Sequence, residues 1–411
     1  MGPVDGAAHL AGRAVAAFRG VRLPDGTLGD VLLDGTAVAD APGAGADLEA
    51  EGWRVLPAAC EPHAHLDKAL SASRLPSGVG NDLVAACESW RAMLPMIDRA
   101  DIEARALATV RRYVAHGITA IRTHVDLHPG SDPFCGVDVL IGLRERLRGR
   151  VTLQVCLLAG SETPTDLIDA AAGRGIDVMG GCPHLALDPP AELTRMLDVA
   201  QAHELPVDLH VDEATDVDMP DADLDIVGLA HQTLARGLRR RVTASHAVRL
   251  GMLPPSRRDS VLAQVARAGL GIVTLPITNL YLQGRDATYA APRGLPALHA
   301  ILAAGIPLGA GADNVRDPFN PAGRADPFET TALLQTAGHL SADQALHAVT
   351  TGARTVLGLP KAGVVPGDVA DLVLVPDVDL GDVLAGTEEA RIVLHGGRVV
   401  ADTRVQRSVD L

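Results

Sequence analysis

The run EPHAHLDK at residues 61–68 decides how the rest of this chain is interpreted. It follows an apolar segment, residues 53–59, that is typical of a buried strand. Side chains alternate between the two faces of a strand, so His63 and His65 are expected to project together from its C-terminal end. Two imidazoles separated by one small residue can bind one divalent metal ion. A pair of surface histidines in a turn is the alternative, and the remaining candidate ligands decide between the two.

Strand-like segments recur along the chain and alternate with helix-permissive ones. Eight such strands are predicted, at 54–59, 118–124, 151–158, 176–182, 206–211, 241–246, 270–275 and 306–312. This alternation is typical of an α/β fold, the (β/α)8 barrel of the TIM type, whose active site lies at the C-terminal ends of the strands. His210, His246 and Asp313 each stand at or just after the end of one such segment. A barrel would therefore bring them close to His63 and His65.

The two chain ends are expected to form a second, smaller unit. At 411 residues the chain exceeds a typical barrel of about 250 residues. Turn dipeptides at 25–26 and 34–35 separate short β-type pieces near the start, and similar pieces recur near the end. Neither end has enough apolar residues for a core of its own. We therefore expect residues 1–53 and 363–411 to pair into one β-sandwich, with the barrel formed by residues 54–362.

Composition excludes several classes of protein. A net charge of −15 and an aromatic content of 2% argue against a nucleic-acid partner. The sequence has no apolar run of about 18 residues and no signal-peptide pattern, so we expect no membrane partner and a cytoplasmic location. The five cysteines are an odd number and are not clustered. This pattern favours reduced thiols over a disulfide scaffold or a zinc knuckle. Whether the chain forms a homo-oligomer stays open.

The motifs resemble those of the amidohydrolase superfamily and, within it, the cytosine deaminase branch. The resemblance is carried by EPHAHLD from residue 61, HVDE ending at Glu213, SH ending at His246, and GADNVRDP at 311–318. Further matches are RTHVD at 122–126, LQV at 153–155, NLYLQGR at 279–285 and GDVADL at 367–372. It extends over nearly the whole chain and implies a metal-dependent barrel hydrolase with a small heterocyclic substrate.

The sequence favours one metal ion per chain. Binuclear barrels of this kind bridge two metals with a carbamylated lysine on a middle strand, whereas the lysines here are Lys68 and Lys361, both elsewhere. The third and fourth strand segments also end without a carboxylate. Zinc and iron(II) both accept ligation by three imidazoles and a carboxylate. The predicted ligands, which the resemblance also implies, are His63, His65, His210 and Asp313.

The predicted chemistry is hydrolysis by a metal-activated hydroxide. Glu213, three residues after His210, is suited to carry a proton to the leaving nitrogen; a solvated loop carboxylate is the alternative. The resemblance implies that His246 hydrogen-bonds the metal water or the developing oxyanion, the alternative being a core histidine bonded to backbone. It also implies that Asp313 both binds metal and steers the proton of the nucleophile.

The predicted substrate contacts depart from the cytosine deaminase pattern. Gly160 stands where those enzymes carry a glutamine that reads the pyrimidine, Asn314 replaces a second aspartate, and Phe319 replaces a tryptophan. Lys68 and Arg316 add positive charge near the expected mouth of the barrel. Together these differences disfavour cytosine itself.

We therefore predict a deaminase that releases ammonia from an aminopyrimidine, aminotriazine or related cyclic amidine. Hydrolysis of a cyclic amide or an N-alkylamino heterocycle, as in ammelide-processing relatives, is the alternative reaction. A non-catalytic small-molecule binding protein is the alternative of another class. Such a protein would be expected to have lost a metal ligand or Glu213, and this chain retains them all.

Overall fold

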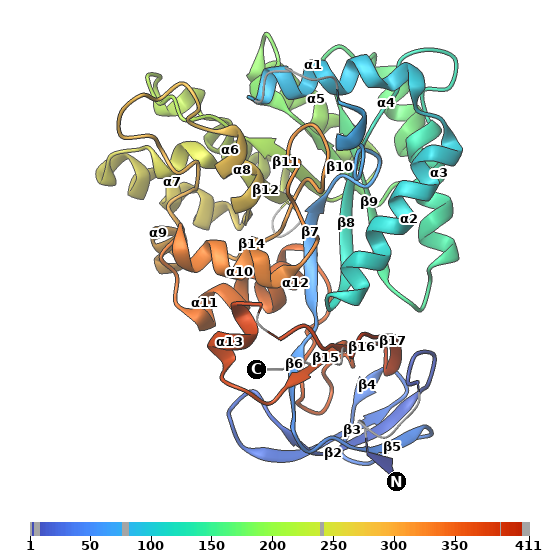
Figure 1. Ribbon diagram of the computed structural model, residues 1–411. Helices are drawn as coiled ribbons and strands as arrows, with labels where there is room; N and C mark the ends of the chain where they lie inside the picture. The colour runs from blue at the N-terminus through green and yellow to red at the C-terminus, as the bar shows by residue number, and fades with distance from the viewer. Residues whose placement is uncertain (1, 4–8, 76–81, 239–241, 387, 405–411) are drawn as a thin grey trace.

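Eight parallel strands follow one another in chain order around a barrel (Figure 1). The computed structural model describes residues 2–3, 9–75, 82–238, 242–386 and 388–404. A backbone bridge between Ala64 and Asp313 joins the first strand to the segment after the last. The predicted (β/α)8 barrel is confirmed. Its strands are β7 (Ala59–Ala64), β8 (Ile118–Asp126), β9 (Thr152–Ala159), β10 (Val178–Gly181), β11 (Val207–Val211), β12 (Val242–His246), β13 (Gly271–Thr274) and β14 (Leu308–Ala310).

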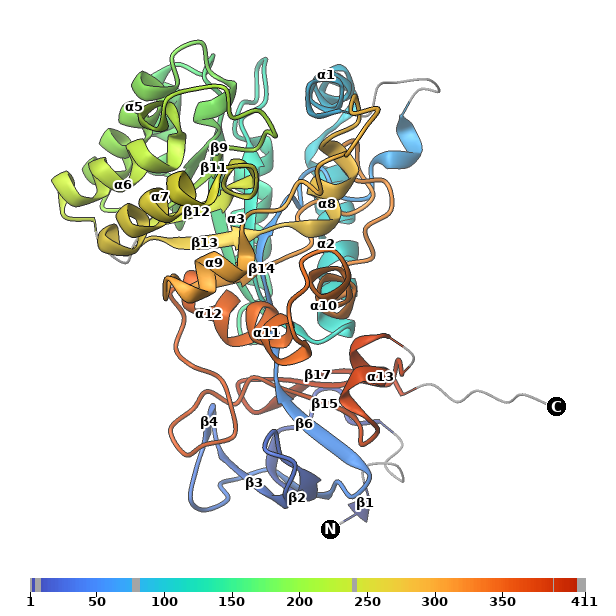
Figure 2. The same ribbon diagram turned by 90° about the vertical axis from the view of Figure 1, so that its left-hand side faces the viewer.

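Helices surround the barrel and connect its strands. The longer ones are α1 (Leu83–Met93), α2 (Arg99–Ala115), α3 (Cys135–Arg146), α4 (Thr165–Ala172), α5 (Pro189–Ala202), α6 (Asp225–Arg236), α7 (Pro255–Ala268) and α10 (Pro327–Thr336). Shorter ones are α8 (Pro276–Leu282), α9 (Leu298–Ala303), α11 (Ala342–His347), α12 (Ala353–Val356) and α13 (Leu380–Leu384). Helix α1 lies across the upper end of the barrel, where the strands end (Figures 1 and 2). Within the described ranges, no helix is both long and apolar enough to cross a membrane.

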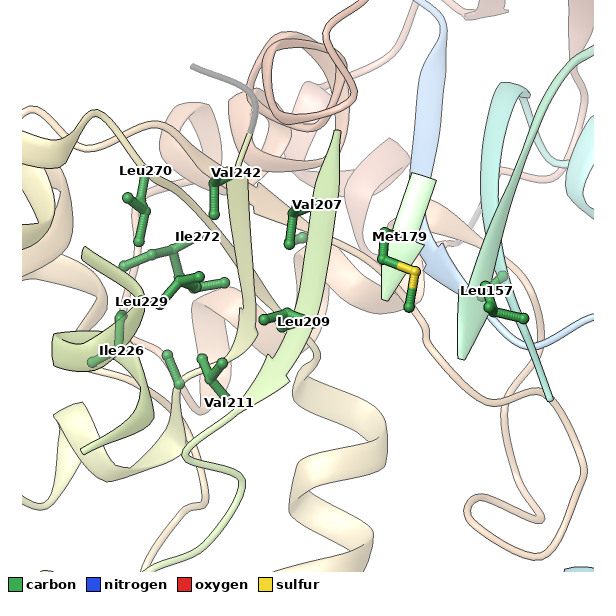
Figure 3. Close-up of a cluster of buried hydrophobic side chains, with 14 of the residues drawn as sticks. Leu157, Met179, Val207, Leu209, Val211, Ile226, Leu229, Val242, Leu270 and Ile272 are labelled. Atoms are coloured by element: carbon green, nitrogen blue, oxygen red, sulfur yellow. The ribbon is translucent and has the colours of Figure 1, made fainter. Parts of the chain in front are cut away.

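Strand β11 shows how the sequence pattern separates core from site. Its alternate residues Val207, Leu209 and Val211 are buried in the apolar layer between the strands and the helices. Figure 3 shows Leu209 and Val211 near apolar side chains of α6. The residues between them, Asp208 and His210, point to the other face, into the barrel, because strand side chains alternate. The same strand thus supplies packing on one face and polar chemistry on the other.

The two chain ends together form a nine-stranded mixed sheet below the barrel (Figure 1). One buried cluster joins Phe18 and Leu33 from the first end with Leu372 and Leu394 from the second. The expected pairing of the two ends into one β unit is confirmed. The strands are β1 (Gly2–Pro3), β2 (Val15–Arg22), β3 (Leu28–Asp34), β4 (Ala37–Val38), β5 (Ala46–Glu49), β6 (Trp53–Pro57), β15 (Leu372–Pro376), β16 (Ile392–His395) and β17 (Arg398–Asp402).

The apolar segment before the histidines contains two strands rather than one. Its first part, β6, pairs antiparallel with β15 in the mixed sheet, and the first barrel strand, β7, begins only at Ala59. The prediction of residues 54–59 as the first barrel strand is therefore wrong. In the sequence, β6 and the start of β7 form one largely apolar run, and the partners that distinguish the two strands lie far away in sequence. His63 thus lies within β7, and His65 directly follows it.

Glu61 links the first barrel strand to the segment just after the last strand. Its Oε2 accepts a hydrogen bond from the Ala312 backbone nitrogen at 2.8 Å, and its Oε1 accepts one from the His63 nitrogen at 3.2 Å. A Cβ at Gly311 would lie 2.0 Å from Glu61 Oε1, so glycine is needed for this close approach. Burial raises the pKa of Glu61 to about 8. The hydrogen bonds of Glu61 to the backbone nitrogens of His63 and Ala312 set the spacing of the segments that carry His63 and Asp313.

Candidate metal centre and active site

The four predicted metal ligands converge at the C-terminal end of the barrel. Nε2 of His210 lies 3.0 Å from Nε2 of His63 and 3.4 Å from Nε2 of His65. Oδ1 of Asp313 lies 3.1 Å from Nε2 of His65 and 3.9 Å from Nε2 of His63. All four side chains are buried. Four potential ligand atoms from three separate segments therefore enclose one small volume.

A chain of hydrogen bonds orients His63. The Ser245 hydroxyl donates to Asp208 Oδ1 at 2.6 Å, so its oxygen is free to accept from Nδ1 of His63, 2.9 Å away. Arg122 in turn donates to the other oxygen of Asp208 at 2.8 Å. With its proton on Nδ1, His63 presents an unprotonated Nε2 to the three other predicted ligands. This is the orientation that outer hydrogen bonds give to metal-binding histidines.

Ser245→Ala is expected to weaken metal binding without unfolding the barrel. The substitution removes the acceptor that fixes the His63 ring, and loss of such outer partners typically lowers metal affinity about 10–100-fold. Competition with a chelator measures the affinity. Ser260→Ala, at an exposed position of α7, is the matched control. Equal metal affinity in the two variants would contradict the role of Ser245.

The charge balance at this point fits a divalent cation. Burial lowers the pKa values of His63, His65 and His210 well below the usual range, which keeps the rings in the neutral form that binds metals. Burial, followed by the nearby Glu213 carboxyl, raises the pKa of Asp313. Oδ1 of Asp313 is buried without a hydrogen-bond partner among the described residues. A cation here would favour the charged carboxylate and occupy its free lone pairs.

Glu213 and His246 lie next to this volume and are linked by Asn279. The Asn279 amide donates to Nδ1 of His246 at 3.1 Å and to Oε1 of Glu213 at 3.4 Å. His246 therefore carries its proton on Nε2, which faces Oδ2 of Asp313 at 3.9 Å. Burial raises the pKa of Glu213 to about 8. A carboxyl group with such a pKa can both accept and donate a proton near neutral pH.

His184 also adjoins Glu213, although the motifs did not single it out. Its Nδ1 donates to the backbone oxygen of His210 at 3.2 Å, and its Nε2 lies 3.9 Å from Oε2 of Glu213. That nitrogen is buried and makes no hydrogen bond to the described residues. It is thus a free acceptor beside the predicted proton carrier. The available signal was a histidine placed just after the fourth predicted strand, 176–182.

His124 stacks on His63 from the neighbouring strand β8, with 3.9 Å between the ring centroids. Ligand atoms of His63, His124 and His210 lie within 4.8 Å of one another, and so do those of His63, His246 and Asp313. Because both groups contain His63, they outline one metal region rather than two separate ones.

A cavity of about 670 Å³ opens over these residues. His65, His210, Glu213, His246 and Asp313 contribute to its polar part. The apolar part of the wall includes Leu83, Trp90, Leu94, Leu158, Leu282 and Phe319. Its size falls within the range of about 300–1,000 Å³ usual for small-molecule sites. The polar groups therefore face a space large enough for an organic substrate.

A buried ion pair lies in the wall of this cavity. Lys68 Nζ lies 2.8 Å from Oδ2 of Asp126 and 3.5 Å from Oδ2 of Asp67. Trp90 Nε1 also donates to Oδ2 of Asp126, at 2.7 Å. Oδ1 of Asp126 makes no hydrogen bond to the rest of the described chain, and this side chain is 21% exposed. The pair thus leaves one carboxylate oxygen available to a ligand.

Gly160, Asn314 and Phe319 line the same cavity, as does Lys68. A Cβ at Gly160 would meet only Thr163 Oγ1, at 3.7 Å, so the wall is open at this point. The Asn314 amide donates to Oδ2 of Asp317 at 2.8 Å and is therefore engaged within its own loop.

Arg316 does not reach this cavity. It is exposed and lines a second cavity together with Arg112 and Arg324. Its backbone is in the left-handed region, with φ of 54°, and its carbonyl oxygen accepts a hydrogen bond from the Ala72 nitrogen at 2.8 Å. The prediction that Arg316 lies at the mouth of the active site is therefore wrong.

Comparisons with known proteins agree with this geometry. Residues 76–401 match the Amidohydrolase family. The pterin deaminase of Rhizobium rhizogenes (strain K84) is 32% identical over 396 residues, covering 92% of this chain and 86% of that protein. The fold matches 5-methylcytosine deaminase from Klebsiella pneumoniae with a TM-score of 0.86 and 23% identity, over 96% of this chain and 100% of the other. N-isopropylammelide isopropylaminohydrolase from Burkholderia multivorans matches with a TM-score of 0.79 and 28% identity, over 94% and 98%.

The chain belongs to the amidohydrolase family. Like its deaminase and aminohydrolase relatives, it is a hydrolase that acts on C–N bonds. The family is metal-dependent, and the histidine–aspartate cluster fits a metal site.

Proposed function

We propose that the protein deaminates an aminopyrimidine ring fused to a second ring, a substrate of the pterin type. The cavity carries this proposal, because a single pyrimidine ring would leave much of its 670 Å³ unfilled. The open wall at Gly160 and the apolar side chains of Trp90 and Phe319 provide space and surface for the second ring. The 32% identity to a pterin deaminase supports the same substrate class.

In this proposal His63, His65, His210 and Asp313 hold one divalent metal, zinc or iron(II). When bound, such a metal supplies hydroxide at neutral pH and acts as a Lewis acid. Glu213 takes a proton released from water and passes it to the ring or leaving nitrogen. His246 donates its Nε2 proton in a hydrogen bond to the oxygen on which charge develops. Water replaces the amino group, and ammonia leaves.

Substrate orientation is assigned to the Lys68–Asp126 pair. The free Oδ1 of Asp126 is placed to accept a hydrogen bond from a ring or amino N–H. Lys68 and the Trp90 indole hold that carboxylate in position through its other oxygen. A charged acceptor in the wall selects rings that present an N–H donor at this edge.

Asp126→Asn is expected to raise KM for the preferred substrate more than it lowers kcat. Loss of a well-placed hydrogen bond costs about 1–3 kcal/mol, or roughly 5–150-fold. Steady-state kinetics measure the change, and thermal melting checks that the protein stays folded when Lys68 retains only Asp67 as an acidic partner. Asp132→Asn, at an exposed position of the same loop, is the matched control. Unchanged KM in a folded Asp126→Asn variant would remove Asp126 from substrate recognition.

A panel of heterocycles tests the proposed reaction. Purified metal-loaded protein is mixed with pterin, cytosine, isocytosine, ammelide and N-isopropylammelide, and released ammonia is measured. We expect kcat/KM for pterin to exceed that for cytosine by at least about tenfold, equivalent to 1.4 kcal/mol. Cytosine as the better substrate would contradict the fused-ring assignment.

Release of an alkylamine is the second candidate. It is supported by the apolar wall, which could receive an N-alkyl group, and by the match to N-isopropylammelide isopropylaminohydrolase. Identification of isopropylamine rather than ammonia as the released product distinguishes the two reactions.

The proposal includes a cytoplasmic enzyme without a nucleic-acid partner. Five free cysteines are consistent with a reducing compartment, and the net charge of −15 disfavours binding to phosphate backbones.

A further inference from the structure

A second cavity, of about 510 Å³, has three arginine side chains in its lining. Arg112 at the end of α2, His116 just after it, and Arg316 and Arg324 from the loop after β14 surround it. Residues 321–323 complete the lining. None of these residues lines the active-site cavity.

The cations in this second cavity are only partly neutralised. Arg324 pairs with Glu329 at 2.9 Å. Arg112 and Arg316 form no ion pair with any acidic side chain in the described ranges, although the chain has 51 acidic and only 36 basic residues. Nδ1 of His116 donates to a backbone oxygen at 3.0 Å, which leaves its Nε2 uncommitted. An excess of positive charge within a concave surface attracts small anions.

The loop of residues 314–324 borders both cavities. Asn314 lines the active-site cavity, whereas Arg316 and Arg324 line the second one. The Asn320 amide donates to the backbone oxygen of Asn314 at 3.0 Å. A Cβ at Gly323 would lie 2.6 Å from that same oxygen, so the two ends of the loop are in close contact. A ligand held by the arginines would therefore act on a segment that follows the metal-binding residue Asp313 directly.

We propose that the second cavity binds the phosphate group of a small phosphomonoester and that the 314–324 loop couples its occupancy to the active site. Arginine guanidinium groups match phosphate oxygens through paired hydrogen bonds. The cavity has the volume of an ordinary small-molecule site, which leaves room for the organic part of the ester.

Calorimetric titration of the metal-loaded enzyme with glycerol 3-phosphate and with inorganic phosphate tests the binding. We expect saturable binding of glycerol 3-phosphate and a loss of about 10–150-fold in affinity in Arg112→Gln and in Arg316→Gln, as for hydrogen bonds to charged groups. Arg111→Gln, at the exposed neighbouring position of α2, should bind as the wild type does. Thermal melting and metal content confirm that the variants are intact.

Four outcomes would overturn the binding proposal. Full affinity in Arg112→Gln and Arg316→Gln would place the phosphate elsewhere, for instance on the catalytic metal. An equal loss in Arg111→Gln would indicate unspecific attraction to surface charge, and absence of saturable binding would exclude the site. Tighter binding of inorganic phosphate than of glycerol 3-phosphate would replace the ester by the free ion.

The coupling has its own readout. Saturating glycerol 3-phosphate is expected to change KM of the substrate about 5–150-fold, the usual range of coupling between two sites, in the wild type but not in Arg112→Gln. An unchanged KM in the wild type would overturn the coupling. The binding titration does not depend on turnover, so failure of the proposed deaminase reaction would be seen separately.

Discussion

Glu213→Gln is expected to retain the metal and lower kcat by about 10²–10⁴-fold. The amide preserves the size of the side chain and its hydrogen bond from Asn279, but it cannot take up and release a proton. Burial raises the pKa of the native carboxyl to about 8, so the group is poised for transfer near neutral pH. Pre-steady-state and steady-state kinetics give kcat, and elemental analysis gives metal content.

Asp218→Asn is the matched control for this variant. Asp218 is exposed and follows the same strand, outside the residues that line the active-site cavity, so its amide should leave kcat unchanged. A loss smaller than about tenfold in Glu213→Gln would place Glu213 outside the mechanism. A loss accompanied by departure of the metal would instead assign it to metal binding.

His65→Ala is expected to abolish metal retention and turnover together. Nε2 of His65 lies 3.4 Å from His210 and 3.1 Å from Asp313, so its removal opens the predicted ligand set on one side. A Lewis-acid metal supplies several kcal/mol of transition-state stabilisation, which corresponds to at least about a thousandfold in rate. Metal per chain and kcat are measured on the same preparation.

The fold should survive this substitution, because the active-site end of such barrels contributes function rather than stability. His203→Ala, at an exposed position after α5, serves as the control and should keep both metal and activity. Full metal content with normal turnover in His65→Ala would contradict the ligand assignment.

The barrel was predictable because its signal is local and repeated. Seven of its strands coincide closely with apolar segments separated by helix-permissive ones, and periodicity alone identifies such segments. The first strand was misplaced because only Ala58 separates β6 from β7, so that residues 53–59 form one largely apolar run in the sequence. Which of the two belongs to the barrel depends on pairing with β15 and β8, and a local pattern does not contain that information.

The site was predictable to the extent that strand ends determine it. His63, His65, His210 and Asp313 converge as expected because parallel strands end at the same rim of a barrel. Arg316 was misplaced because the loop after β14 places it in the lining of the second cavity, and nothing in the local sequence pattern indicates this.

The partners of the predicted residues were harder to foresee. Ser245, Asp208, Asn279 and His184 act through contacts between segments that are remote in sequence. Ser245 and Asn279 lie within the quoted motifs, but only the folded arrangement reveals what these side chains touch.

Activity as a function of metal content tests the central claim most directly. The protein is stripped with a chelator, reloaded with measured amounts of zinc or iron(II), and assayed for ammonia release from its best heterocyclic substrate. The mononuclear account predicts no turnover without metal and a linear rise to a plateau at one metal per chain. Full turnover without metal, or a plateau reached only at two metals per chain, would contradict it.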